Sequence, residues 1–137
     1  MKVKLNENAI KPTRAHDTDA GLDLYSPYAT IVKSRSSAVI DTGVCVELPH
    51  NTVGFLKSKS GLNVNKGILS EGVIDEGYTG SIVVKLYNHS YDDVMVERGQ
   101  KITQLVVLPC LYEEVELVDA LGETSRGEQG FGSTDDC

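Results

Sequence analysis

The chain has 137 residues, of which 40% are apolar and 24% are charged, and its formal net charge is −7. This length and composition indicate one globular domain with a sizeable core. The acidic balance argues against direct nucleic-acid binding, because neutralising phosphates along a duplex requires a basic surface. No apolar run approaches the length of a membrane span and the first residues hold no apolar leader core, so we expect no membrane partner and a cytoplasmic location.

Short runs of alternating, β-branched residues dominate the chain, and Gly, Asn, Asp and Pro separate them. Such runs predict strands rather than helices. In chain order they cover residues 3–5, 30–34, 37–48, 52–58, 73–74, 81–88, 93–97, 101–108 and 113–118. Only residues 63–66 allow a short helical turn. Many short strands with regular turns predict an all-β fold, a jelly-roll barrel or sandwich.

Clustered carboxylates come first along the chain, in the segment of residues 15–27. Asp17, Asp19 and Asp23 are oxygen ligands of the kind that a hard cation such as Mg²⁺ prefers. The alternative is an acidic loop in which Asp23 caps a turn. His16 and the other two histidines show no ligand spacing and are interpreted as surface residues.

Residues 57–67 form a basic cluster in an otherwise acidic protein. Lys59 is followed by Ser60 and Gly61, which offer a hydroxyl and a backbone open to close approach. This combination predicts an anion-binding loop, and a solvated lysine-rich turn is the alternative.

Residues 71–88 read as a β-hairpin with Asp75 at its mouth and Tyr78 near its tip. A hairpin that carries an acid, an aromatic ring and free backbone groups is suited to a flat polar ring. The alternative is a plain turn in which Asp75 accepts a backbone N–H. Gln104, on the strand of residues 101–108, reads by itself as a solvent-facing residue.

The strand pattern stops at Gly122, and residues 122–137 are rich in glycine and hydroxyl groups. This composition predicts a flexible, glycine-rich C-terminal arm after a core of residues 1–121. The arm resembles a P-loop only superficially, because no lysine precedes Ser133 and Thr134. Arg126 and the hydroxyls suit phosphate, and Phe131 suits stacking on a base.

Five segments, taken together and in order, resemble the trimeric dUTP diphosphatase (dUTPase) family: AGLDLYSP, KSKSGL, GVIDEGYTG, RGQKITQL and RGEQGFGST. The resemblance implies a jelly roll and a homotrimer whose three active sites each use segments of all three chains. It implies the Mg²⁺-assisted hydrolysis of dUTP to dUMP and pyrophosphate, which keeps uracil out of DNA and supplies dUMP for thymidylate synthesis.

The resemblance also assigns residues to roles. Asp75 matches the general base that deprotonates the attacking water, and Asp23 matches the acid that contacts the metal through water. The matching phosphate contacts are Lys59, Ser60, Gly61, Gln104, Arg126, Gly132, Ser133 and Thr134. The matching contacts for uracil and deoxyribose are Gly72, Val73, Ile74, Tyr78, Val83 and Phe131. The family commonly has arginine at the position of Lys59, so this phosphate contact is expected to orient its ligand less strictly.

Two other functions compete with the hydrolase. A dCTP deaminase of related fold would need further deaminating chemistry, for which no segment of this chain matches. A dUTPase-like protein that acts by binding a regulatory protein is the other alternative, and such a partner is compatible with an active enzyme.

Overall fold

The computed structural model describes residues 1–128 and residue 130. The strands in this part of the chain are β1 (Lys2–Leu5), β2 (Gly21–Tyr25), β3 (Thr30–Val32), β4 (Ser37–Glu47), β5 (Thr52–Ser58), β6 (Ile68–Ile74), β7 (Ser81–Asn88), β8 (Val94–Val96) and β9 (Lys101–Pro109). The helix α1 (Ser60–Lys66) lies between β5 and β6. No helix within the described residues has the length and apolarity needed to cross a membrane.

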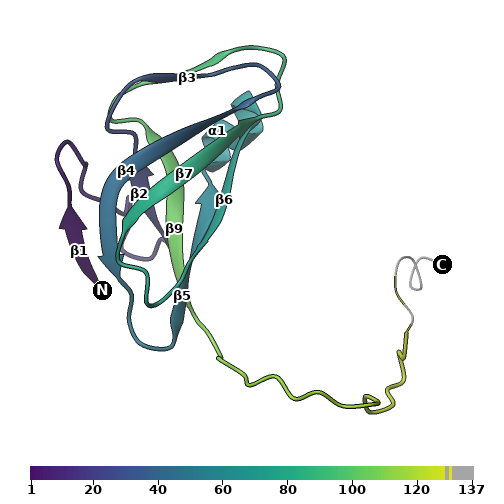
Figure 1. Cartoon of the computed structure of the whole chain (residues 1–137). Helices are drawn as coiled ribbons and strands as arrows, with labels where there is room; N and C mark the ends of the chain where they lie inside the picture. Colours follow the sequence, from purple (N-terminus) through teal and green to yellow (C-terminus); the bar gives the residue numbers. More distant parts are fainter. Residues whose placement is uncertain (129, 131–137) are drawn as a thin grey trace.

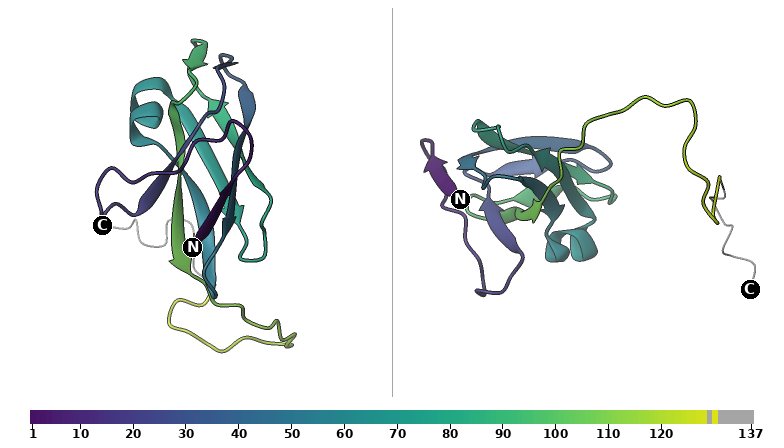
Figure 2. Two further views of the ribbon diagram at one scale, coloured as in Figure 1. Left: turned by 90° about the vertical axis from the view of Figure 1, so that its left-hand side faces the viewer. Right: turned by 90° about the horizontal axis from the view of Figure 1, so that it is seen from below.

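The strands form a curled antiparallel sheet (Figures 1 and 2). Within the described residues, seven strands follow the order β1-β4-β7-β6-β5-β9-β2, and β3 pairs with β8 in a separate ribbon. Strand β6 joins the two halves, because residues 68–70 pair with β7 whereas residues 71–74 pair with β5. The all-β jelly-roll fold expected from the sequence is confirmed.

The core lies between the two halves of the sheet and follows from the period-2 pattern. On β7, Ile82, Val84 and Leu86 are fully buried, and the residues between them are exposed. They share one apolar cluster with Leu24 of β2 and Leu105 of β9. Burying each of these side chains contributes about 1.5–3 kcal/mol.

The predicted strands at residues 52–58 and 81–88 have the observed bounds of β5 and β7. The short turn at residues 63–66 belongs to α1, which ends at Gly67 in a left-handed conformation with φ of 64°. The strand predicted at residues 113–118 is wrong for this chain: those residues form no strand. A strand needs a hydrogen-bonding neighbour, and beyond β9 the chain leaves the sheet.

The segment after Pro109 runs away from the sheet, as Figures 1 and 2 show. Its apolar side chains are exposed, with Val115 at 89%, Leu117 at 93% and Leu121 at 88%. Within the described residues, no part of the chain covers these alternating apolar side chains.

Candidate functional site

Asp23 lies on β2 and is held by two lysines from other elements. The Lys59 ammonium is 2.6 Å from Asp23 Oδ1, and the Lys101 ammonium is 2.7 Å from Oδ2. Asp23 is only 4% exposed, and burial of an unpaired carboxylate would be costly. The two lysines therefore compensate one nearly buried negative charge.

The pKa of Asp23 reflects two opposing effects. Burial raises it, but hydrogen bonds and charge from Lys101 and Lys59 outweigh burial and set the pKa below its ordinary value of 3.8. The same ion pair raises the pKa of Lys101, first through its hydrogen bond to Asp23. Asp23 is therefore ionised at neutral pH.

Gln104 completes this group, which we call the Asp23 cluster: Asp23, Lys59, Lys101 and Gln104. Gln104 is the register partner of Asp23 on β9, and its amide nitrogen donates to the Ser58 carbonyl over 3.2 Å. The cluster lines a pocket of about 310 Å³. Gly21 allows this packing, because a Cβ there would lie 2.4 Å from the Gln104 amide oxygen.

Ser60 and Gly61 adjoin the Asp23 cluster as the first two residues of α1, directly after Lys59. Both are exposed, and no atom lies within 4 Å of the position that a Gly61 Cβ would occupy. The structure thus gathers five predicted phosphate- or metal-facing residues in one region, namely Asp23, Lys59, Ser60, Gly61 and Gln104.

Asp75 lies elsewhere, in the loop of residues 75–80 between β6 and β7, which we call the Asp75 loop. Its carbonyl accepts a hydrogen bond from Tyr78 N–H at 3.0 Å, which closes a turn. Asp75 is exposed and lines a pocket of about 440 Å³ together with His50, Glu76 and Tyr112. Its carboxylate can accept a proton from a molecule in this pocket.

Tyr78 has a fixed ring in the same loop. Its hydroxyl donates to the Ser81 carbonyl at 2.8 Å. The ring packs on Gly80, where a Cβ would lie 2.6 Å from the Tyr78 hydroxyl oxygen. Tyr78 is nevertheless 44% exposed, so part of the ring remains available to a ligand.

The expected hairpin of residues 71–88 is open at its mouth. Its strands pair only at residues 68–70 and 86–88 within the described chain, whereas Gly72, Val73 and Ile74 pair with β5 instead. Val83 pairs with Asp41 of β4 and is 48% exposed. The backbone edges of β6 and β7 that face each other beside the Asp75 loop are therefore free of mutual pairing.

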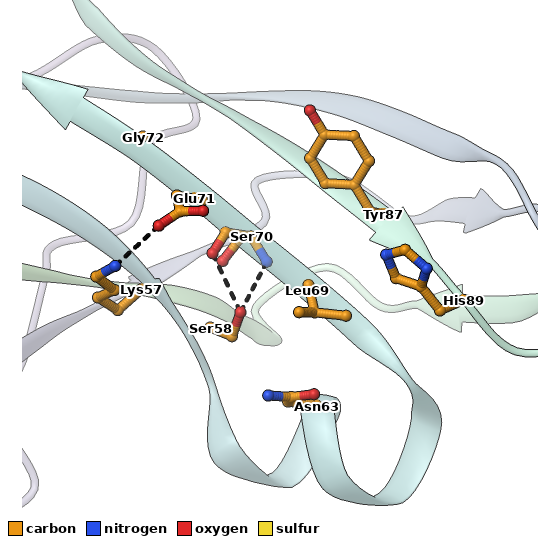
Figure 3. A pocket seen from close by; sticks show the side chains of 9 residues that line it. All are labelled: Lys57, Ser58, Asn63, Leu69, Ser70, Glu71, Gly72, Tyr87 and His89. Carbon is orange, nitrogen blue, oxygen red and sulfur yellow. Dashed lines mark hydrogen bonds and ion pairs between the residues drawn. The ribbon is translucent and has the colours of Figure 1, made fainter. Parts of the chain in front are cut away.

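Gly72 also lines a cavity of about 790 Å³ between α1 and strands β5, β6 and β7 (Figure 3). Two interactions join β5 to β6 beside this cavity: the Lys57–Glu71 ion pair at 2.9 Å and the hydrogen bond from Ser70 N–H to the Ser58 hydroxyl at 2.9 Å. Tyr87 and Leu69, which are register partners, are both exposed at this cavity.

The Asp23 cluster and Asp75 are far apart within one chain. Register pairing leads from Asp23 on β2 to Gln104 on β9, then to Lys57 on β5 and to Glu71 on β6, which is three strand spacings. Asp75 follows Glu71 by four residues. At about 4.8 Å per strand and 3.3 Å per residue, the separation along the sheet is roughly 20 Å. Within one chain, the predicted site residues therefore form two separate groups.

Sequence reasoning missed Lys101 and the neighbours of Glu76. The Glu76 carboxylate contacts His50 Nδ1 at 2.6 Å, Asn51 N–H at 2.9 Å and the Tyr112 hydroxyl at 2.7 Å. These partners come from a turn and from the segment that follows β9, so no local pattern could reveal them. For Lys101, the one sequence feature that pointed to a pairing with Asp23 was its opposite charge.

The described residues do not by themselves form a complete site for the expected Mg²⁺ ion. They contain no group of three or more His, Cys, Asp or Glu side chains that could hold an ion by themselves. Mg²⁺ commonly keeps several waters and uses one or two carboxylates plus substrate phosphates. In this structure both carboxylate oxygens of Asp23 are paired with lysines, and Asp19 lines the same pocket.

The arm carries the remaining predicted residues. Arg126 is described and exposed. Phe131, Gly132, Ser133 and Thr134 lie outside the described residues.

Known protein sequences that resemble this chain belong to one family. A model of the dUTPase family matches residues 7–135. A deoxyuridine 5'-triphosphate nucleotidohydrolase of Clostridium tetani is 42% identical over 138 residues, covering 98% of this chain and 95% of that protein. The protein of the same name from Clostridium novyi is 44% identical over 134 residues, covering 96% and 94%.

Solved structures of proteins from the same family have a similar fold. The dUTPase of Staphylococcus bacteriophage 80alpha with dUPNHPP is 31% identical with a TM-score of 0.89, covering 97% of this chain and 96% of that chain. A mutant dUTPase from phage phi11 of S. aureus, described as revealing the coordination of a structural Mg(II) ion, is 29% identical with a TM-score of 0.81, covering 87% and 96%.

Proposed function

The chain belongs to the dUTPase family and hydrolyses dUTP to dUMP and pyrophosphate, and we propose that Asp75 is the general base of this reaction. The observation that carries the proposal is the position of Asp75: an exposed carboxylate in a closed turn, beside the open mouth of the β6–β7 hairpin. A base must be within hydrogen-bond reach of the proton that it takes.

The reaction needs one proton transfer and one exchange of bonds at phosphorus. Asp75 accepts a proton from a water molecule as the water oxygen bonds to the α-phosphorus. The bond from the α-phosphorus to the bridging oxygen breaks, and pyrophosphate leaves with its electron pair. The protein contributes position and electrostatic stabilisation, which dominate catalysis of phosphoryl transfer.

The Asp23 cluster is the proposed triphosphate site. Lys59, Ser60, Gly61 and Gln104 supply a positive charge, a hydroxyl and N–H groups around the pocket that Asp23 lines. Mg²⁺ bound with the phosphates would neutralise part of their charge. Asp23 would hold the waters of that ion, which requires one of its two lysines to turn toward phosphate.

The hairpin mouth is the proposed nucleoside site. At Gly72, Val73, Ile74 and Val83, the edges of β6 and β7 that face each other are not paired with each other. Backbone groups on these two edges can read the polar edge of uracil. The Tyr78 ring, held by Ser81, would pack on deoxyribose and leave no room for a 2′-hydroxyl. Contact with backbone explains why the side chains here are apolar.

The active enzyme is proposed to be a homotrimer with shared sites. The separation of roughly 20 Å between Asp75 and the Asp23 cluster is too far for one triphosphate to bridge within a chain, which supports a site to which different copies contribute. The exposed apolar residues between β9 and the arm also favour a neighbouring copy.

The segment of residues 122–137 is proposed as a lid on the site of a neighbouring copy, after a core of residues 1–121. Arg126, Gly132, Ser133 and Thr134 would contact phosphate, and Phe131 would cover uracil. Ordering such a segment costs about 1–2 kcal/mol per residue, and charge-assisted bonds of about 1.5–3 kcal/mol each can offset that cost.

A regulatory protein partner is the second candidate function. The similar 80alpha dUTPase is described as controlling transfer of virulence genes by a G protein-like mechanism. A pull-down with and without dUTP would separate a nucleotide-gated partner from none. The proposed cytoplasmic location suits both functions.

One panel tests the proposed function. Pyrophosphate release is measured from dUTP, UTP, dTTP and dCTP, with and without Mg²⁺. The proposal expects release from dUTP alone and only weakly without the metal. Ammonia release from dCTP would instead support a deaminase.

A further inference from the structure

The Glu76 carboxylate, next to Asp75, is the meeting point of three separate parts of the chain. It accepts the backbone N–H of Asn51 at 2.9 Å and contacts the Nδ1 atom of His50 at 2.6 Å, both from the turn between β4 and β5. It also accepts a hydrogen bond from the Tyr112 hydroxyl at 2.7 Å. Tyr112 belongs to residues 110–121, between β9 and the arm, which we call the root of the arm. Its side chain is only 26% exposed, unlike that of an ordinary surface glutamate.

Fixing Glu76 also fixes the direction of Asp75. The hydrogen bond from Tyr78 N–H to the Asp75 carbonyl makes residues 75–78 one closed turn, in which Glu76 is the second residue. Two adjacent residues in a closed turn share their connecting peptide, so anchoring one side chain limits how the other can rotate. Within the described chain, the Asp75 side chain makes no hydrogen bond or ion pair that could replace this restraint.

Tyr112 extends the anchor to the root of the arm. Its hydroxyl lies 2.7 Å from Glu76 Oε2 and 3.1 Å from the Thr52 carbonyl. Two residues earlier, Cys110 N–H donates to the Asn51 carbonyl at 2.9 Å. The hydrogen bond to Glu76 comes first among the causes that raise the pKa of Tyr112 to about 12. The root of the arm and the Asp75 loop therefore share one network.

We propose that Glu76 is a positioning residue for Asp75, and that Tyr112 couples the root of the arm to the same anchor. This rests on the proposed role of Asp75 as general base. Without the anchor, the Asp75 carboxylate samples orientations in which it misses the attacking water. The Tyr78 ring keeps its own restraints, the hydrogen bond to the Ser81 carbonyl and the packing on Gly80, and the Asp23 cluster lies elsewhere, so the contacts that bind the sugar and the triphosphate persist. The loss therefore falls mainly on kcat rather than on KM.

Three variants test the proposal in the full-length enzyme. Glu76→Ala removes all three contacts and is expected to lower kcat about tenfold or more, with KM within about twofold, because small misplacements of a reacting group are costly. Glu76→Gln keeps the shape and one acceptor oxygen, and should recover part of that loss. Tyr112→Phe removes one bond and should lower kcat less than Glu76→Ala does.

Asp93→Ala is the matched control. The Asp93 carboxylate likewise accepts a backbone N–H, from Ser34 at 2.8 Å, and pairs with a basic side chain, Lys33 at 2.8 Å, but it lies at the β3–β8 ribbon. This variant should keep both kcat and KM. Thermal melting of every variant shows whether the fold survives, and Tyr112→Phe tests the anchor even where Glu76→Ala unfolds.

A titration of tyrosine absorbance gives a readout independent of turnover. The difference between wild type and Tyr112→Phe isolates the Tyr112 hydroxyl, and Glu76→Gln should move its pKa from about 12 back toward 10.0. Wild-type kcat in Glu76→Ala and Tyr112→Phe, or a loss confined to KM, would overturn the inference. If Asp75→Asn is itself fully active, the proposed function fails instead, which keeps the two failures distinct.

Discussion

The Lys59 ammonium lies 2.6 Å from the Asp23 carboxylate, and this pair joins the two residues proposed to face phosphate and metal. Because Lys101 also contacts Asp23, the carboxylate keeps a partner when Lys59 turns to a ligand. The cluster therefore holds two positive charges against one negative charge, so one lysine can turn to the triphosphate while Asp23 stays paired with the other.

Replacing Lys59 by alanine should weaken catalysis through the phosphate. A charge-assisted hydrogen bond contributes about 1.5–3 kcal/mol, so kcat/KM for dUTP should fall on the order of ten- to a hundredfold. Lys59→Arg should retain most of the activity, since arginine also binds phosphate. Lys33→Ala removes a lysine from an exposed ion pair and should change nothing. An alanine variant at position 59 that matches wild type would remove Lys59 from the phosphate site.

Asp23 should make stability depend on pH in the acidic range. Its pKa in the folded protein lies below 3.8, so the folded state favours the ionised form, and this stabilisation is present above about pH 4 and lost as the pH falls through the folded pKa. Urea unfolding of wild type and Asp23→Asn should therefore differ at pH 7 and converge below pH 3.8. Other carboxylates with lowered pKa values are common to both proteins and cancel in the comparison. An equal difference at every pH would contradict the assignment.

Gly80 should matter for recognition of the sugar. An alanine Cβ there would lie 2.6 Å from the Tyr78 hydroxyl oxygen, so the ring has to move. Gly80→Ala is expected to raise KM for dUTP and reduce the preference for dUTP over UTP. In Gly77→Ala, in the same loop, the added methyl meets nothing within 4 Å, and the preference should persist. Unchanged discrimination in Gly80→Ala would remove the ring from sugar selection.

Truncation after Leu121 tests the proposed lid. The last strand in the described part of the chain ends at Pro109, so the shortened chain should keep its β-sheet circular dichroism and melt cooperatively. Turnover should nonetheless fall by a hundredfold or more, because several charge-assisted contacts of about 1.5–3 kcal/mol each are lost. A folded truncated enzyme with full activity would show that the arm does not take part in catalysis.

Sequence alternation was enough to locate most strands and not enough to assign their partners. Residues 52–58 and 81–88 alternate because one face is buried, and both strands were predicted with their observed bounds. Residues 113–118 show the same alternation but have no strand partner among the described residues. Periodicity reports which face of a segment is covered, and it does not say which molecule covers it.

In the candidate site, too, the residue types could be predicted from the sequence, whereas their long-range partners could not. The residue types around Asp23, Lys59 and Asp75 were recognisable from local motifs. The pairing of Asp23 with Lys101 depends on the register of β2 against β9, where Tyr25 pairs with Lys101 across a bulge. The anchor at Glu76 likewise depends on a long-range contact, 36 residues away at Tyr112.

Exchange of the Asp75 carboxylate for an amide tests the central claim most directly. Asparagine keeps the size and the turn but cannot accept the proton of the attacking water, so single-turnover cleavage of dUTP should slow by about 10²–10⁴-fold while dUTP still binds. Asp75→Asn protein that melts like wild type and cleaves dUTP at the wild-type rate would contradict the account.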